Sequence, residues 1–281
     1  MTDLVSRIES HAAALPPAER RVAELVLSQP GLAAFSTVAE LGRRAGTSGA
    51  TVVRLAERLG YAGWVGLQAE ERAGLDQQLR PATERIRESA RGDLLAQSAQ
   101  RESDNLRRTL DAVDPKLFDR AVDQLADRRH EVHVLAGDAE AGIGLFLVDG
   151  LDLLRPGVHR ANGSSPAVAR RLAHVRRGDV VVAIDLRRYE RWVVDAVALT
   201  AGRGAAVIAI TDSVISPLAQ RAAVTFAVTA EGPGPFDSHV GTLALVNALV
   251  AGVARRLRRP AAARLDRVER AWRDTDVITA D

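Results

Sequence analysis

The sequence contains no cysteine, which excludes disulfides, thiolate metal ligands and thiol nucleophiles. A chain without cysteine suits a reducing compartment, so we expect a cytoplasmic protein. Aromatic residues make up only 4% of the chain, so Ala, Val and Leu must build its cores. Lysine occurs once, at Lys116, and arginine therefore carries almost all of the positive charge.

The sequence also lacks an apolar run as long as a membrane span. The longest run, residues 242–254, falls short of the roughly 20 residues required, and it predicts a buried helix. The first ten residues include Asp3, Arg7 and Glu9 and lack the apolar block of a signal peptide. A chain of 281 residues favours two domains. We therefore expect a soluble two-domain protein without a membrane partner.

Helix start and stop signals divide the first 80 residues into five predicted helices. Pro17 opens the second helix, Thr37 and Glu40 form a capping box for the third, and Ser48 caps the fourth. The sequence therefore predicts a compact all-α domain over residues 1–80, followed by a connecting helix over residues 81–114.

The hydrophobic pattern changes after residue 129. Short β-branched runs, which alternate with helical segments, lie at 131–135, 158–161, 180–184, 206–210 and 224–228. Apolar strands interleaved with helices are typical of a parallel sheet covered on both faces. We predict a doubly wound α/β sandwich of about five strands over residues 115–259 and a basic helix or tail over residues 260–281.

The segment VAELGRRAGTSGATVVRLAERL, residues 38–59, has the spacing of a helix-turn-helix. Apolar residues fall where the two helices must touch, at Leu41, Val52 and Leu55. Gly42 permits close approach of the helices and Gly46 supplies the turn. The alternative is an ordinary α-hairpin whose arginines are solvated.

In a helix-turn-helix the second helix enters the major groove with its N-terminal residues leading. The candidate base-contacting residues are Ser48, Gly49, Ala50, Thr51 and Arg54. The candidate phosphate-contacting residues are Arg43, Arg44 and Arg58. The partner predicted from these residues is double-stranded DNA.

Two stretches, PPAERRVAELVLSQP and TVAELGRRAGTSGATVVRLAERLGYAGW, resemble the RpiR/MurR group of bacterial transcription regulators. The resemblance continues through DAVDPKLFDRAVDQLAD, GDVVVAI, GAAVIAITDSVISPLAQRAAV and SHVGTLALVNAL and covers nearly the whole chain. It implies a helix-turn-helix domain joined to an SIS (sugar isomerase) domain. Such a domain is expected to oligomerise, to a dimer or tetramer, and to hold a sugar-phosphate effector.

The ligand loops depart from the family pattern, in which a Gly/Ser loop follows the first strand and a Ser-x-Ser-Gly-x-Thr-like loop follows a later one. Glu140 stands where a serine is expected, and Asp185, Arg187 and Glu190 stand at the two serines and the threonine. The candidate ligand-site residues are Asp138, Glu140, Asp185, Arg187, Arg188, Glu190 and Ser213. Their four carboxylates would repel a phosphate dianion, whereas the two arginines would offset that repulsion.

Three interpretations of this degenerate site follow: a polyhydroxylated or cationic effector, a domain kept for dimerisation alone, and a sugar phosphate held by rearranged arginines. Simple helix capping by Asp138 and Asp185 is a further alternative. The six histidines show no metal-ligand spacing, so we expect neither a metal nor a cofactor.

Together these features predict an oligomeric DNA-binding transcription regulator rather than an enzyme. A protein-interaction scaffold and a sugar-phosphate isomerase with an accessory helical domain are the alternatives. The operator, the effector, the target genes and the choice between activation and repression have no readable signal in the sequence.

Overall fold

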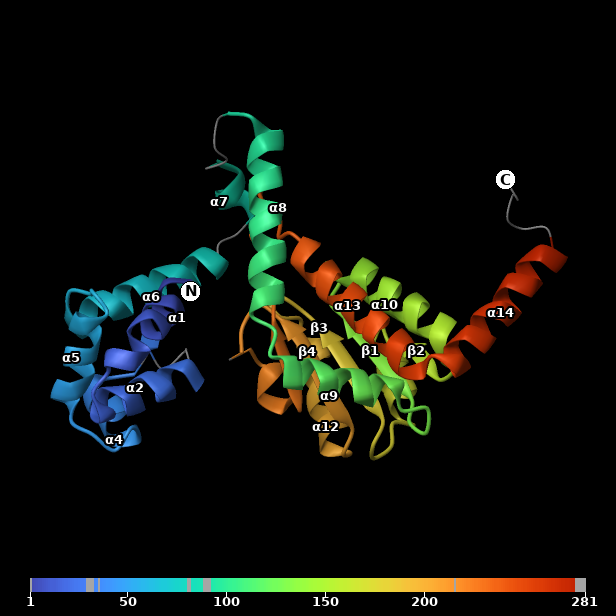
Figure 1. Cartoon of the computed structure of the whole chain (residues 1–281), viewed down its shortest axis with the longest axis horizontal. Helices are drawn as coiled ribbons and strands as arrows, with labels where there is room; N and C mark the ends of the chain where they lie inside the picture. The colour runs from blue at the N-terminus through green and yellow to red at the C-terminus, as the bar shows by residue number, and fades with distance from the viewer. Residues whose placement is uncertain are drawn as a thin grey trace. The chain divides into compact units, whose positions relative to one another are not determined.

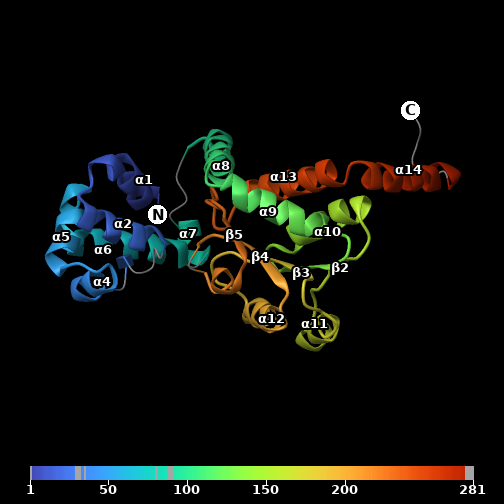
Figure 2. The same ribbon diagram turned by 60° about the horizontal axis from the view of Figure 1, so that its bottom comes forward.

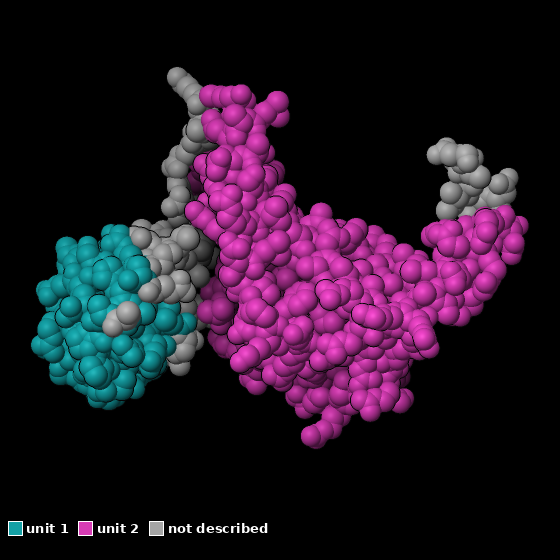
Figure 3. Space-filling model, in the orientation of Figure 1, with its two compact units in different colours: residues 1–81 teal, residues 82–281 magenta. Residues whose placement is uncertain are grey.

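The computed structural model describes residues 2–28, 33–34, 36–79, 82–87, 92–214 and 216–275 (Figure 1). The chain divides into two compact units, residues 1–81 and 82–281 (Figure 3).

The first unit is helical. Its elements are α1 (Thr2–His11), the 3₁₀ turn η1 (Ala12–Ala14), α2 (Pro17–Ser28), α4 (Val38–Arg44), α5 (Gly49–Arg58) and α6 (Gly63–Leu79). The predicted caps are confirmed, because Thr37 accepts a hydrogen bond from the Glu40 amide and Ser48 accepts one from the Thr51 amide. Leu41, Val52 and Leu55 lie in the buried core of this unit, as predicted.

The second unit begins with α7 (Ala82–Arg87), α8 (Leu94–Asp111) and α9 (Pro115–Ala126). The prediction of a single connecting helix is therefore wrong. Asp93 starts a new helix by accepting hydrogen bonds from the amides of Leu95 and Ala96. Gly92 precedes it with a φ of 142°, a conformation that interrupts a helix.

The predicted parallel sheet is confirmed. It contains β1 (Val132–Ala136), β2 (Val158–Arg160), β3 (Val180–Ile184), β4 (Ala206–Thr211) and β5 (Val224–Ala227). Neighbouring strands pair in parallel in the order β2-β1-β3-β4-β5, with Val134 opposite Val182 and Val182 opposite Ile208. Every residue of β1 and β3 is buried, which explains why β3 is apolar throughout and β1 is apolar except at His133.

Helices cover both faces of this sheet (Figure 2). The helices α9, α10 (Ala141–Leu154) and α13 (Val240–Leu257) pack on one face, and α11 (Ser165–Leu172) and α12 (Arg191–Gly202) pack on the other. The 3₁₀ turn η2 (Ala219–Arg221) precedes β5, and α14 (Arg259–Asp274) follows α13. The strand order reverses between β1 and β3, so the loops after these two strands diverge. Ligands of such sheets usually bind between these loops, and we refer to this place as the crevice.

The long apolar helix α13 is only partly the buried helix that the sequence predicts. Its length and composition would suit a membrane span, yet Leu245, Leu249 and Val253 belong to the core beneath it. The inner side of α13 belongs to the core, and 33% of the residues of the helix are buried in the unit.

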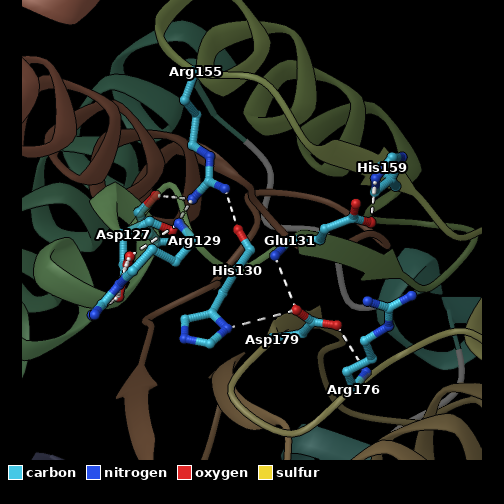
Figure 4. A network of polar contacts seen from close by, with 9 residues as sticks. Asp127, Arg129, His130, Glu131, Arg155, His159, Arg176 and Asp179 are labelled. Atoms are coloured by element: carbon cyan, nitrogen blue, oxygen red, sulfur yellow. Dashed lines mark hydrogen bonds and ion pairs between the residues drawn. The ribbon is translucent and has the colours of Figure 1, made fainter.

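A polar network ties the loops at the opposite, amino-terminal edge of the sheet (Figure 4). The guanidinium of Arg155, 1% exposed, donates to the carbonyls of Leu125 at 2.7 Å and Asp127 at 3.1 Å, near the end of α9. The Asp179 carboxylate accepts from the amides of Glu131 at 3.0 Å and Arg176 at 2.8 Å. These contacts satisfy buried backbone groups, so the network is structural.

Candidate DNA-binding surface and ligand crevice

The corner between α4 and α5 requires glycine. A Cβ atom on Gly42 would lie 2.9 Å from the backbone nitrogen of Gly49, so a side chain there would force the helices apart. Gly46 turns the chain with a φ of 61°, in the left-handed region. The predicted roles of both glycines are confirmed.

The leading end of α5 is open to solvent. Ser48, Ala50 and Arg54 are exposed, and Gly49 is half-buried. Small residues at the tip allow the helix backbone to come close to another surface, while Arg54 lies one turn further along. Such a surface fits the base edges of a major groove.

Thr51 does not share this exposure. It is 4% exposed, and its hydroxyl oxygen accepts hydrogen bonds from the Thr47 hydroxyl at 3.0 Å and the Arg54 guanidinium at 3.1 Å. This burial removes Thr51 from the groove-facing residues expected from the sequence. Its hydroxyl instead holds Arg54 against the first turn of α5.

Two of the three arginines proposed for phosphate contact have partners within the unit. The Arg58 guanidinium lies 2.7 Å from the buried carboxylate of Glu19, whose hydrogen bond raises the pKa of Arg58 above its ordinary value. Arg44 forms an exposed pair with Glu40 at 2.8 Å. Arg43 is exposed and forms no ion pair with the residues that the structure describes.

Sequence reasoning missed the side chain that braces this corner. Arg21 of α2 donates to the carbonyls of Ala45 at 3.1 Å and Gly46 at 3.2 Å. No local pattern marks Arg21, because its partners lie 24 and 25 residues further along the chain.

In the second unit, three predicted ligand-site carboxylates meet at the crevice between β1 and β3. The Cβ position of Gly137 lies 2.7 Å from Glu140 Oε2, 2.9 Å from Asp185 Oδ1 and 3.2 Å from Glu190 Oε1. Glu140 and Asp185 are buried, so their carboxylates lie inside the unit rather than on its surface. A side chain at position 137 would collide with all three.

The Glu190 carboxylate accepts hydrogen bonds from two N–H groups of the crevice. Its Oε1 accepts from the Asp138 amide at 2.5 Å, and its Oε2 accepts from the Trp192 indole. The Glu190 amide in turn donates to Asp185 Oδ2 at 2.8 Å. Asp185 therefore accepts the amide of the residue that precedes α12, which agrees with the capping role that the sequence allowed for it.

Burial is the main cause of the raised pKa values of Glu140 and Asp185. Loss of hydration raises the pKa of Glu140 from 4.5 to about 8, and the nearby Asp185 and Glu190 carboxylates add to the effect. Loss of hydration likewise raises the pKa of Asp185 from 3.8 to about 7, assisted by Glu190. Below these pKa values Glu140 and Asp185 are protonated, and the loss of their charge removes the repulsion among the three carboxyl groups.

Of the other predicted ligand-site residues, Asp138 contacts this trio through its amide, and Arg187 has its ion-pair partner elsewhere. Arg187 is ion-paired with Asp237 at 3.1 Å, and Arg85 of α7 binds the same carboxylate at 2.6 Å. Asp138 and Arg188 are exposed, whereas Ser213 is buried. Within the described residues, no group of three or more histidine and carboxylate side chains could hold a metal ion.

The comparisons with known proteins cover both units. Residues 2–77 match the family described as helix-turn-helix domain, rpiR family, and residues 125–252 match the SIS domain. The transcriptional regulator HexR of Pseudomonas aeruginosa is 27% identical over 265 residues, which span 91% of this chain and 90% of HexR.

The sugar isomerase domain of the RpiR transcription factor from Sphaerobacter thermophilus superposes with a TM-score of 0.59. It is 33% identical, and the match covers 64% of this chain and 99% of that structure. The chain belongs to the RpiR family of transcription regulators. The Vibrio vulnificus NanR protein has the same fold over 99% of this chain and 100% of its own, with 24% identity and a TM-score of 0.58. The family predicted from the sequence is thus confirmed.

Proposed function

We propose that this RpiR-family regulator binds double-stranded DNA through the leading end of α5. The exposed tip formed by Ser48, Gly49 and Ala50, followed by Arg54, carries the proposal. Arg54 reads a base edge or a phosphate, and Arg43 and Arg44 contact phosphates beside it. Arg58 reaches DNA only after it leaves Glu19.

Replacement of Arg54 tests the DNA contact. The Arg54→Ala variant should weaken binding to the protein's own promoter region by about 10- to 100-fold, the effect expected for one specific arginine contact. Fluorescence anisotropy at several salt concentrations measures this loss. Arg191→Ala, which removes an exposed arginine from α12, is the matched control. Wild-type protein that shows no salt-dependent DNA binding would favour a protein-interaction scaffold instead.

The C-terminal domain, in this proposal, joins two subunits and thereby spaces two copies of α5. Two such helices related by a two-fold axis read half-sites about one helical turn apart. A small molecule that favours one arrangement of the subunits would change DNA binding. The regulator acts in the cytoplasm, where bacterial DNA is found.

The effector in this proposal is not an ordinary sugar phosphate. NanR was solved in complex with ManNAc-6P. In this chain a phosphate would have to displace Glu190 from the Asp138 amide and then lie against Glu140 and Asp185. Polyhydroxylated or cationic molecules suit these carboxyl groups better. Thermal-shift measurements should show stabilisation by a member of those classes and none by sugar phosphates.

We also propose that the chain is not an isomerase, although several structures with this fold are named as isomerases. Two relatives that match 73% and 91% of the chain are named as transcription regulators. Turnover of any aldose or ketose phosphate would overturn this part of the proposal.

A further inference from the structure

The arginine in the last turn of α5, Arg58, lies on the same side of the helix as Arg54, because the two residues are at positions i and i+4. Both side chains are exposed, so the spacing alone would make Arg58 a second DNA contact. The structure gives it a partner within the unit instead, since its Nε donates a hydrogen bond to Oε2 of Glu19 on α2 at 2.7 Å. Glu19 balances the charge of Arg58, so the pair presents no net charge to a phosphate.

The two side chains of this pair differ in their exposure to water. The Arg58 side chain is 43% exposed, whereas the Glu19 side chain is 5% exposed. Within the part of the chain that the structure describes, Arg58 is the one cation that pairs with Glu19. A carboxylate that is buried without a counter-charge is strongly destabilising. To bind a phosphate as a free cation, Arg58 would have to leave this carboxylate buried and unpaired.

The pair also suits the ends of the two helices that it joins. Glu19 lies in the first turn of α2, where the partial positive charge of the backbone amides favours an acid. Arg58 lies in the last turn of α5, where the partial negative charge of the carbonyls favours a base. The contact therefore stabilises both helix ends and fixes the C-terminal end of α5 to α2.

Two further arginines hold α5 from outside the helix-turn-helix. Arg7 of α1 donates to the carbonyl of Leu59, the C-cap of α5, at 3.1 Å. Arg21 of α2 braces the corner that precedes α5 through the carbonyls of Ala45 and Gly46. Side chains of α1 and α2 thus hold α5 at its C-terminal end and at the corner before its N-terminal end.

The orientation of α5 decides what its leading end can contact. The helix has 10 residues and is about 15 Å long, so a tilt of about 10° about its C-terminal end moves the leading end by about 2–3 Å. A hydrogen bond to a base edge does not survive such a displacement. A contact that fixes the C-terminal end of α5 therefore controls readout by the residues at its other end.

We infer that Arg58 is a positioning residue and not a phosphate contact: paired with Glu19, it holds α5 at the angle that brings Arg54 and the tip of the helix to the bases. The inference rests on the proposed function, because it assigns a role within the same DNA-binding surface. It removes Arg58 from the arginines that release counterions from DNA. It also makes the buried Glu19 a determinant of DNA affinity.

Glutamine substitutions separate the two roles, since the Nε2 atom of glutamine can take the place of the arginine Nε. In the double variant Glu19→Gln with Arg58→Gln, a neutral hydrogen bond replaces the ion pair and the net charge is unchanged. Promoter affinity should stay within about threefold of wild type, with the same slope of log K against log salt concentration. Arg58→Met leaves Glu19 without a donor, so it should weaken promoter binding at least about tenfold and lower the melting temperature.

Arg43→Gln is the matched control, because Arg43 is exposed and is proposed to contact a phosphate. It should reduce the salt slope by about 1 and weaken binding to every DNA sequence, as anisotropy titrations at several salt concentrations will measure. A double variant that loses slope as Arg43→Gln does, or binds the promoter as weakly as Arg58→Met, overturns the inference. A wild type without salt-dependent binding overturns the proposed function and this inference with it, a result distinct from failure of the double variant alone.

Discussion

The buried carboxyl cluster should make the free energy of unfolding depend on pH. Substitution of Glu140 measures this dependence. The Glu140 side chain is 3% exposed, and burial raises its pKa from 4.5 to about 8. The folded protein therefore holds a proton that the unfolded chain releases above about pH 4.5. The stabilisation is complete below that pH and disappears as the pH rises through about 8.

The size of the effect follows from the two pKa values. At about 1.4 kcal/mol for each pKa unit, the difference between 4.5 and about 8 corresponds to about 4–5 kcal/mol. Asp185 shares the same protons and its own pKa is raised to about 7, so the two contributions do not add. We therefore expect the wild type to lose about 4 kcal/mol of unfolding free energy between pH 5 and pH 9 through this cluster.

The Glu140→Gln variant isolates this contribution because glutamine keeps the shape and never ionises. Urea denaturation followed by circular dichroism, at pH values from 5 to 9, should show a flatter pH dependence for Glu140→Gln than for wild type. Asp195→Asn, which changes an exposed carboxylate on α12, should run parallel to wild type. If the Glu140→Gln and wild-type curves are also parallel, Glu140 does not hold a proton in the folded protein and the reasoning is refuted.

Three further substitutions test individual contacts. Glu190→Thr frees the Asp138 amide, so inorganic phosphate should raise the melting temperature of this variant and not that of wild type; equal shifts would contradict the assigned contact. Gly42→Ala should cost about 1–3 kcal/mol and weaken DNA binding, because the new Cβ meets the α5 backbone. Gly202→Ala, with open space around it, is the control for both readouts. Arg155→Ala should cost about 3 kcal/mol in chemical denaturation because it leaves buried carbonyls unpaired, and a neutral result would show that water replaces the guanidinium.

Much of the fold was predictable from patterns within short stretches of the sequence. Thr37 and Ser48 cap helices through partners three residues away, so their roles follow from short spacing. The buried strands β1 and β3 are recognisable because a strand covered on both faces is apolar at nearly every position, with His133 the exception in β1. The three carboxylates at the crevice were also expected together, because the family resemblance places them in its two ligand loops.

The amino-acid sequence by itself thus determined most of the helices, the parallel sheet, the helix-turn-helix corner and the family. Tertiary structure alone decided which side chains are free to act. Glu19 holds Arg58 across 39 residues of chain, and Glu190 reaches the Asp138 amide across 52. Thr51 has a local partner, yet its burial depends on the helices packed around α5. Such outcomes depend on distances between separate elements, and periodicity and capping patterns carry no information about those distances.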